Sequence, residues 1–549
     1  MIHRLKQFAS KQNSLVGATA LLVTTTLLSN VLGLLRDRFL AQKITTDALD
    51  TYFAAFRVPD FLFNFLILGT VSAAFIPVFV QYRAKSEQAA WEVASVMITL
   101  AVVILVGLSM LLAIFMPALI PFIVPDFSIE KQALTIELAR VMLIQPIFFG
   151  LSYLFSGVLN AMKRFTVYAI APLIYTASII VATLGFADQY GVKAVVWGVV
   201  IGAVLHMFTQ LLAIRSLDIR LAPILQLRHP SLKQIFSMMW PRSIALGAMQ
   251  LMLLVFTAIG SSLGAGSVAV YSLADNIQTM PTAVFALSFI TALFPTISEA
   301  AAKRKLDEVA SHVWRGIRYL IVIMVPSGVG IFLIRAQVVR LILGTGYFDW
   351  EATVATASTL GFFASSLLAQ SLVVHLSRTF YALHDTRTPT LYNVIGYSVA
   401  ILAAYTLAPM SGLGMGVPGL ALAFSIGSTV NAILLYTTVR TRLPQLRRAE
   451  QGFSQFLFQV LIATVSLIAV VQLAKAGVAG VVDMNRFWGV LAQTSVACLS
   501  GALAYWTALR TMRVPELSEL SGILLARFRP KLPPAVSAAQ DTSTDGAST

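Results

Sequence analysis

The chain has 549 residues, of which 58% are hydrophobic and 11% are charged, whereas soluble domains are about 25% charged. This composition excludes a soluble globular protein and predicts a polytopic membrane protein. The net charge of +15 does not indicate nucleic acid binding, because the basic residues lie in short segments between apolar stretches, where anionic lipid headgroups attract them.

The apolar stretches define the expected helices. A helix needs about 20 mostly apolar residues to cross a bilayer core of about 30 Å, and fourteen stretches meet this need. In chain order they are 16–34, 51–80, 91–123, 133–160, 165–186, 192–214, 235–260, 266–298, 316–343, 353–382, 389–409, 415–438, 453–474 and 487–509. The first follows a basic start, as a signal peptide does, but thirteen further stretches favour an uncleaved helix.

The basic residues between these stretches predict the orientation. Most of the 39 Lys and Arg lie at the two termini or in every second gap, with clusters at 215–233, 303–318 and 440–448. Loops rich in Lys and Arg face the cytoplasm. Both termini are therefore expected to be cytoplasmic.

The chain also repeats itself. Residues 157–165 (Gly-Val-Leu-Asn-Ala-Met-Lys-Arg-Phe) and 379–387 (Thr-Phe-Tyr-Ala-Leu-His-Asp-Thr-Arg) each end one apolar stretch and lead into the next. A Gly-Val pair follows each copy, at Gly191 and Gly416. Asp385, four residues before Pro389, is expected to cap the next helix. The repeat predicts two six-helix halves in parallel orientation, an arrangement that many transporters share.

The expected organisation of this all-helical protein has six parts. They are a basic cytoplasmic N-terminus (1–15), a first six-helix bundle (16–215), a basic cytoplasmic linker (216–234), a second six-helix bundle (235–440), two appended helices (453–512) and a disordered cytoplasmic tail (530–549).

Polar side chains inside the apolar stretches are the candidate functional residues. Ionisable groups within a membrane usually face a water-filled cavity or a partner. We assign Arg36, Arg57, Asn30, Asn64 and Asn276 as candidate substrate-binding residues, and Asp37, Asp50, Asp60 and Asp275 as candidate coupling or gating residues.

Structural alternatives exist for some of these residues. Arg36 and Asp37 could form a solvated helix end, and Asp275 could form a structural salt bridge with Arg57 or Arg36. Arg57 and Asp60 are less easily explained in this way, because the apolar stretch continues through them. We therefore expect these residues to mark a substrate pathway between the two halves.

The sequence carries no enzyme signature. It has no Gly-rich phosphate loop, no His-Glu-x-x-His and no Gly-x-Ser-x-Gly, the motifs typical of nucleotide, zinc and serine chemistry. The acids are scattered singly, and Cys498 is the one cysteine, so no metal site, cofactor or intrachain disulfide is expected.

Four segments together resemble the MurJ (MviN) family of lipid II flippases, within the multidrug/oligosaccharidyl-lipid/polysaccharide exporter superfamily. They are residues 32–37 (Leu-Gly-Leu-Leu-Arg-Asp), 50–60 (Asp-Thr-Tyr-Phe-Ala-Ala-Phe-Arg-Val-Pro-Asp), 72–77 (Ser-Ala-Ala-Phe-Ile-Pro) and 380–389 (Phe-Tyr-Ala-Leu-His-Asp-Thr-Arg-Thr-Pro). The resemblance covers the first twelve expected helices, and the last two match the fourteen-helix plan of the family.

The resemblance implies transport of undecaprenyl-pyrophosphoryl-disaccharide-pentapeptide (lipid II) from the inner to the outer leaflet of the bacterial cytoplasmic membrane. It implies a cationic cavity for the headgroup, a lipid-tail groove leading to 453–512, and cell-wall synthesis machinery as a partner. By this resemblance Arg36 matches a cavity arginine, and Asp50 and Asp275 match acids near the cavity.

The chain departs from the family pattern at several cations. Asn30 and Asn276 stand where the family usually has arginine, and Phe63-Asn64 stands where it has Arg-Arg. Arg36 and Arg57 must therefore bind the headgroup with fewer cationic neighbours in this chain, or the headgroup differs from that of the family.

Several alternatives remain open at this stage. One is a flippase for another polyprenyl-linked glycan, a second is a cation-coupled drug exporter, and a third is a scaffold for cell-wall assembly that transports nothing. The energy source is expected to be the membrane potential, H⁺ or Na⁺, acting through Asp50, Asp60 or Asp275.

Overall fold

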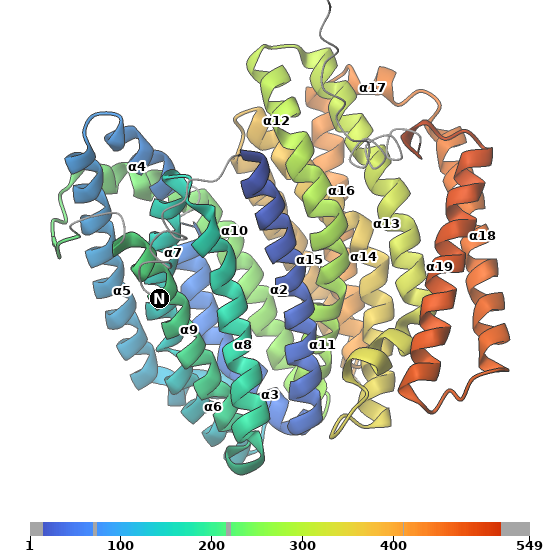
Figure 1. Ribbon diagram of the computed structural model, residues 1–549, viewed down its shortest axis with the longest axis horizontal. Helices are drawn as coiled ribbons and strands as arrows, with labels where there is room; N and C mark the ends of the chain where they lie inside the picture. Colours follow the sequence, from blue (N-terminus) through green and yellow to red (C-terminus); the bar gives the residue numbers. More distant parts are fainter. Residues whose placement is uncertain (1–14, 70–73, 216–220, 410, 518–549) are drawn as a thin grey trace, which may run out of the picture.

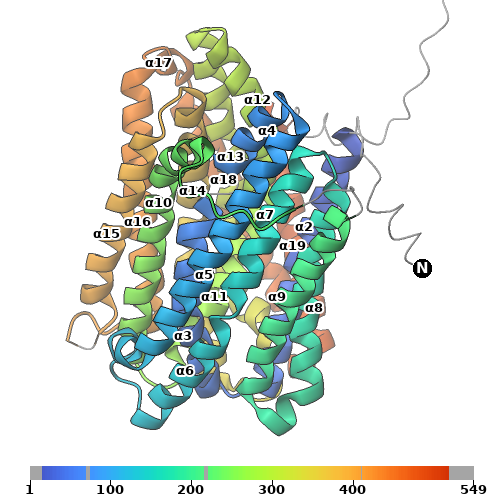
Figure 2. The ribbon, with the colours of Figure 1, turned by 90° about the vertical axis from the view of Figure 1, so that its left-hand side faces the viewer.

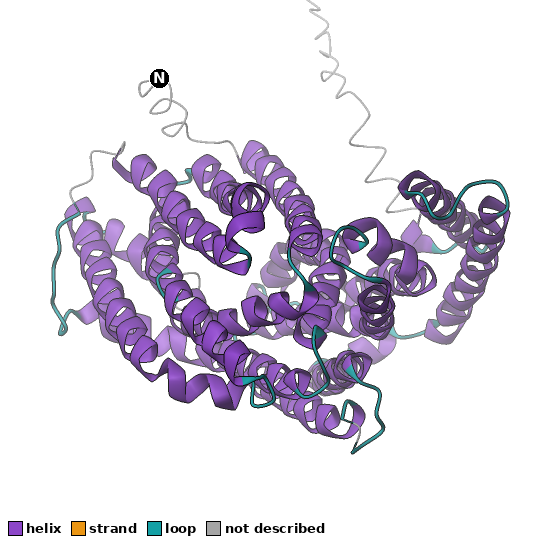
Figure 3. Cartoon of the chain, turned by 90° about the horizontal axis from the view of Figure 1, so that it is seen from below, coloured by secondary structure: helices purple, strands orange, loops and turns teal. Residues whose placement is uncertain are grey.

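The computed structural model describes residues 15–69, 74–215, 221–409 and 411–517. Every regular element among these residues is a helix (Figure 3). Nearly all of the basic N-terminus (1–15) and the whole tail (530–549) lie outside the described residues.

Thirteen helical segments of the described chain are long and apolar enough to cross a membrane. The remaining expected span, 16–34, lies in helix α2 (Leu15–Lys43), which has 29 residues. The predicted class, an all-helical polytopic membrane protein, is confirmed.

The first half of the chain forms one group of helices (Figures 1 and 2). After α2 come α3 (Thr46–Phe63), the π-helix η1 (Asn64–Leu68), α4 (Ile76–Arg83), α5 (Glu87–Ile123), α6 (Ile129–Met142), α7 (Gln145–Ala161), α8 (Phe165–Tyr190) and α9 (Val192–Arg215).

The second half repeats this order. It contains α10 (Pro230–Ser261), α11 (Ser267–Pro281), the π-helix η3 (Thr282–Leu287), α12 (Ser288–Ala302), α13 (Leu306–Leu343), α14 (Trp350–Ala382), α15 (Arg387–Leu407) and α16 (Val417–Arg442). The short α17 (Leu446–Ala449) leads to α18 (Phe453–Ala479) and α19 (Phe487–Thr511), which lie beside α13 (Figure 1).

The backbone carries the repeat that the sequence indicates. Lys163 and His384, at the same place in the two copies of the motif, both have left-handed φ angles, 59° and 60°. Gly191 and Gly416 also match, with φ of 56° and 64°. A π-helix, which is rare and often marks a functional site, follows both α3 and α11.

Polar caps fix several helix ends. Asp385 accepts hydrogen bonds from the backbone N–H groups of Arg387 (2.9 Å) and Thr388 (3.0 Å), so its predicted capping role is confirmed. Although burial raises the pKa of Asp385, hydrogen bonds from Thr388 and Arg442 lower it more, and the net pKa lies below its usual value. The cap therefore stays ionised.

Some helices extend beyond the apolar windows. Helix α13 begins at Leu306 and not near residue 316, and α5 begins at Glu87. Helix α10 begins at Pro230, inside the segment 216–234 that the sequence assigns to the linker. Hydropathy detects the part of a helix that lies in lipid, whereas the caps and the first charged turn lie in water.

Helices α18 and α19 are held to α13 by a chain of polar contacts. The Nζ of Lys475 donates to the carbonyl of Leu333 at 2.8 Å, next to a break in the helical backbone at Ile334. Gln493 donates to the carbonyl of Lys475 at 2.8 Å and accepts from Gln337 at 3.0 Å. Such interhelical hydrogen bonds join helices where lipid offers no hydrophobic driving force.

Close packing of α15 on α16 leads to a first prediction. A Cβ added to Gly427 would collide with the carbonyl oxygen of Gly396 and lie 2.7 Å from the Cβ of Ala400. We expect Gly427→Ala to destabilise the protein by about 1–3 kcal/mol, the usual effect of overpacking. The apparent Tm in detergent should fall by several degrees.

Gly107→Ala is the matched control, because a Cβ at Gly107 in α5 meets no atom within 4 Å. Its Tm should stay the same or rise slightly, since alanine favours helix more than glycine does. Equal Tm values for Gly427→Ala and the native chain would contradict the packing argument.

Candidate functional site

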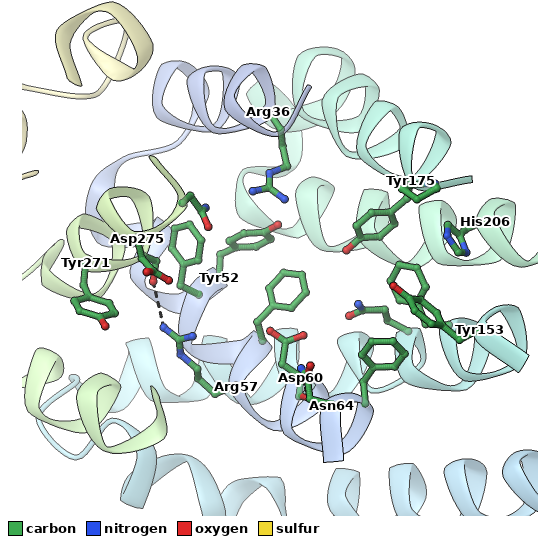
Figure 4. A pocket seen from close by; sticks show the side chains of 18 residues that line it. Arg36, Tyr52, Arg57, Asp60, Asn64, Tyr153, Tyr175, His206, Tyr271 and Asp275 are labelled. Carbon is green, nitrogen blue, oxygen red and sulfur yellow. Dashed lines mark hydrogen bonds between the residues drawn. The ribbon is translucent and has the colours of Figure 1, made fainter. Parts of the chain in front are cut away.

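A cavity of about 400 Å³ lies between the two halves (Figure 4). Helices α2, α3, α7, α8 and α9 and the π-helix η1 of the first half, with α11 of the second half, supply its walls. We call it the central cavity. Six of the predicted site residues line it: Arg36, Arg57, Asp60, Asn64, Asp275 and Asn276.

Arg36 is held in place by its neighbour in the sequence. Its Nε and Nη2 donate to one carboxylate oxygen of Asp37, at 2.9 and 2.7 Å. The other oxygen of Asp37 accepts from Asn276 of α11 at 2.9 Å. Asp37 is buried and does not line the cavity, so it orients Arg36 and links α2 to α11.

Arg57 bonds to hydroxyl groups of the other half. Its Nε donates to the Oγ1 of Thr257 at 2.7 Å, and its Nη2 donates to the Oγ of Ser272 at 3.2 Å. Among the described residues no carboxylate lies within ion-pair distance of Arg57. Its positive charge therefore faces the cavity without a direct counter-ion.

The two acids of the central cavity are not in ion pairs within the described chain. The side-chain amide of Gln278 donates to Asp275 at 2.9 Å, and the salt bridge considered for Asp275 is not formed. Asp60 points into the cavity near Asn64 (Figure 4). With Arg36 and Arg57, the lining holds two cationic and two anionic side chains.

Aromatic residues that the sequence analysis did not single out form much of the wall. Tyr52 and Tyr175 lie near Arg36, and Tyr153 and His206 lie at the end away from Asp275 (Figure 4). His206 is buried, and its Nδ1 lies 2.6 Å from the Oγ of Ser152. A histidine inside the apolar stretch 192–214 was the one available signal, whereas tyrosines in apolar helices are unremarkable in a sequence.

Asp50 lies outside the central cavity, near the start of α3. The connection between α2 and α3 lies at the lower end of Figure 1. Asp50 is fully buried, and it accepts hydrogen bonds from the backbone N–H groups of Gly266 (2.7 Å) and Ala269 (2.8 Å). Lys131 donates to it at 2.8 Å. Asp50 thus accepts hydrogen bonds from backbone N–H groups at the start of α11 that have no partner within the helix. It also joins the two halves.

Other contacts also join the halves at the lower end. Arg38 donates to the carbonyl of Leu341 at 2.5 Å. Gly346 packs so closely on the backbone of Gln42 that any Cβ there would overlap it. The two halves are therefore closed against each other at this end.

Asn30 lines a second cavity, of about 180 Å³, which adjoins the central cavity. Its Nδ2 is buried and has no hydrogen-bond partner among the described residues. As for metals, the described residues contain no group of three or more His, Cys, Asp or Glu side chains that could hold an ion.

The chain matches known proteins over most of its length. The family described as "Lipid II flippase MurJ" matches residues 7–506. The lipid II flippase MurJ of Burkholderia cenocepacia is 29% identical over 464 residues, which cover 80% of this chain and 86% of that protein.

Solved structures show the same fold. A structure described as lipid II flippase MurJ in an inward closed conformation has a TM-score of 0.75 at 22% identity, over 90% of this chain and 100% of that one. An inward-facing multidrug resistance MATE transporter of the MOP superfamily has a TM-score of 0.67 at 17% identity, over 76% of this chain and 96% of that one.

Proposed function

The chain belongs to the MurJ lipid II flippase family, and from this premise we propose that it carries lipid II across the bacterial cytoplasmic membrane by alternating access. It is a transporter and not an enzyme. The observation that supports the mechanism most is the position of Arg57, whose charge faces a cavity between the two halves without a carboxylate partner in the described chain.

Moving a charged headgroup across the bilayer requires such a cavity. A pyrophosphate and its attached sugars would lose their hydration in the bilayer, and unpaired charges and hydroxyl groups are costly to bury. A guanidinium offers a planar fork of donors that suits phosphate oxygens. We propose that Arg57 and Arg36 bind the pyrophosphate, with Asn64 and Asn276 beside it.

The charge balance suggests how transport is driven. The central cavity holds two arginines and two aspartates, so a pyrophosphate with two negative charges would leave the loaded site anionic. Protonation of both Asp60 and Asp275, or binding of two monovalent cations such as Na⁺, would restore neutrality. We propose that substrate loading is coupled to this step and to the membrane potential, which does about 2.3 kcal/mol of work per charge per 100 mV.

This coupling yields a prediction for Asp60→Asn and Asp275→Asn. With the carboxylate gone, the loaded cavity needs one compensating charge fewer. Transport by reconstituted protein should therefore depend less steeply on the imposed H⁺ or Na⁺ gradient. Asp188→Asn, an exposed acid paired with Lys43, should keep the native dependence; the same native dependence in both cavity variants would remove the coupling proposal.

We further propose the orientation that the basic loops indicate, with both termini cytoplasmic. The lower end of Figure 1 is then the outer end, and the described conformation is closed toward the outside. The lipid tail is proposed to lie along α18 and α19, where Phe458, Leu461, Leu499 and Leu503 are exposed. Association with cell-wall synthesis machinery stays a prediction.

A second candidate function is a flippase for another polyprenyl-linked glycan. Asn30 and Asn276, in place of the arginines that the family usually has, favour it. A bacterium depleted of its own lipid II flippase distinguishes the two, because this chain should restore growth and outer-leaflet lipid II. Failure of a well-inserted native chain would favour the other glycan.

A further inference from the structure

The second cavity, which Asn30 lines, has no role in the proposed binding of the pyrophosphate. We propose that it is a subsite for the uncharged saccharide part of the headgroup; this inference rests on the proposed function. The cavity of about 180 Å³ lies between α2, α7, α8 and α9. Tyr153, Pro172 and His206 line both cavities, so a ligand in one can extend into the other.

Two side-chain amides that line this space have atoms without a hydrogen-bond partner in the described part of the chain. Gln210 is fully buried, and neither its amide nitrogen nor its amide oxygen has a partner among the described residues. The Nδ2 of Asn30 is also unpaired there. Buried polar groups are nearly always hydrogen-bonded, and leaving one without a partner is costly. These amides are therefore available to bond to a polar ligand that enters the second cavity.

The chemistry of the lining indicates what kind of ligand fits. Among the described residues, no carboxylate, ammonium or guanidinium group lines the second cavity. The hydroxyls of Thr25 and Ser156 bond to carbonyls of their own helices, and Thr26, Ser29, Tyr153 and Tyr168 add further uncharged hydroxyl groups to the lining. An ionised phosphate or peptide terminus would find no counter-charge there. Sugar hydroxyls and N-acetyl groups are uncharged and both donate and accept.

Position and size agree with this assignment. Asn30 precedes Arg36 by six residues on α2, which is about 9 Å along a helix. A sugar bonded directly to a pyrophosphate at Arg36 and Arg57 lies within such a distance. Moreover, the 400 Å³ of the central cavity is near the lower limit for drug-sized ligands, and a disaccharide with a pentapeptide needs more space.

The second half offers a natural comparison. The cavity of about 170 Å³ between α10, α14, α15 and α16 shares no lining residue with the central cavity. Here Asn431 donates to Asn393 at 2.8 Å and Gln370 donates to Gln278 at 3.0 Å, while the Oδ1 of Asn431 has no partner among the described residues. Asn431→Leu is therefore a matched control for the loss of a buried amide.

The test measures the binding of two lipids to the purified full chain in nanodiscs. The probes are lipid II and undecaprenyl pyrophosphate, which has the same anion and tail but no sugar. We expect Gln210→Leu to weaken lipid II binding about tenfold, the effect of one or two uncharged hydrogen bonds. Binding of undecaprenyl pyrophosphate should not change, and Asn431→Leu should change neither.

Asn30→Leu is a second variant, on a different helix, in case Gln210→Leu does not fold. It should show the same selective loss of lipid II binding. Native affinity for lipid II in the folded variants, or an equal loss for both lipids, would overturn the subsite while leaving the proposed function intact. A native chain that binds no lipid II would overturn the proposed function and this inference with it.

Discussion

Arg57→Ala is expected to abolish lipid II transport, with a fall in the flipping rate of at least about 100-fold, as for the loss of a charged donor worth about 3 kcal/mol. The reason is that Arg57 is the cavity cation without a carboxylate partner in the described chain, whereas Arg36 is bound to Asp37. The measurement is the appearance of lipid II at the outer leaflet of liposomes that contain the purified protein. Arg57→Lys should retain part of the rate, because lysine keeps the charge but loses the planar fork.

Arg140→Ala is the matched control for Arg57→Ala. Arg140 is exposed on α6, donates to the carbonyl of Ala113 and does not line the central cavity. Its removal should leave transport at the native rate. If correctly inserted Arg57→Ala protein also transports at the native rate, the cationic cavity is not the route. If Arg57→Ala protein instead transports no lipid II in liposomes and still rescues a depleted bacterium, the scaffold alternative is favoured.

A disulfide across the lower end is expected to stop transport completely and reversibly. A Cβ on Gly266 would lie 3.1 Å from the Cβ of Thr46, and disulfides join Cβ atoms about 3.5–4.5 Å apart. A small adjustment would therefore let Thr46→Cys and Gly266→Cys form a bond between the two halves. If the outer end must open in each cycle, oxidation should block flipping and a reductant should restore it.

The cross-link experiment needs two controls. Cys498 is exposed, so the background variant is Cys498→Ser. Gly266 has a φ of 82°, which strains any other residue, and Gly266→Cys alone shows the cost of that substitution. Native transport by fully cross-linked protein would contradict alternating access through an opening at this end.

Much of the fold could be predicted because its signals are local. Apolar stretches must be helical in lipid, since every backbone polar group has to be satisfied within the segment. The repeated motif also predicted a backbone feature, the matching turns at Lys163 and His384. The capping role of Asp385 could also be predicted, because a capping residue lies within a few residues of the helix that it caps.

The candidate site was only partly predictable. Six of the nine predicted polar residues line the central cavity. Polar groups inside apolar stretches are costly to expose to lipid, so they usually face a polar interior. Asp50 is an exception in kind, because its carboxylate caps a helix of the other half, more than 200 residues away along the chain. Tyr52 and Tyr175 gave no signal, because tyrosines occur in many buried helices. Gln210, a polar residue inside the apolar stretch 192–214, did give one and was not among the predicted residues.

The sequence by itself therefore determined the class of protein, the approximate spans, the repeat and the polar residues that had to avoid lipid. The tertiary structure decided which of these residues meet. It placed Arg57 against hydroxyls, paired Arg36 with Asp37 and left the amide of Gln210, within the described chain, without a hydrogen-bond partner beside the cavity. The physical reason is that hydropathy and capping depend on neighbours along the chain, whereas the partner of a buried polar group depends on which faces of distant helices pack together.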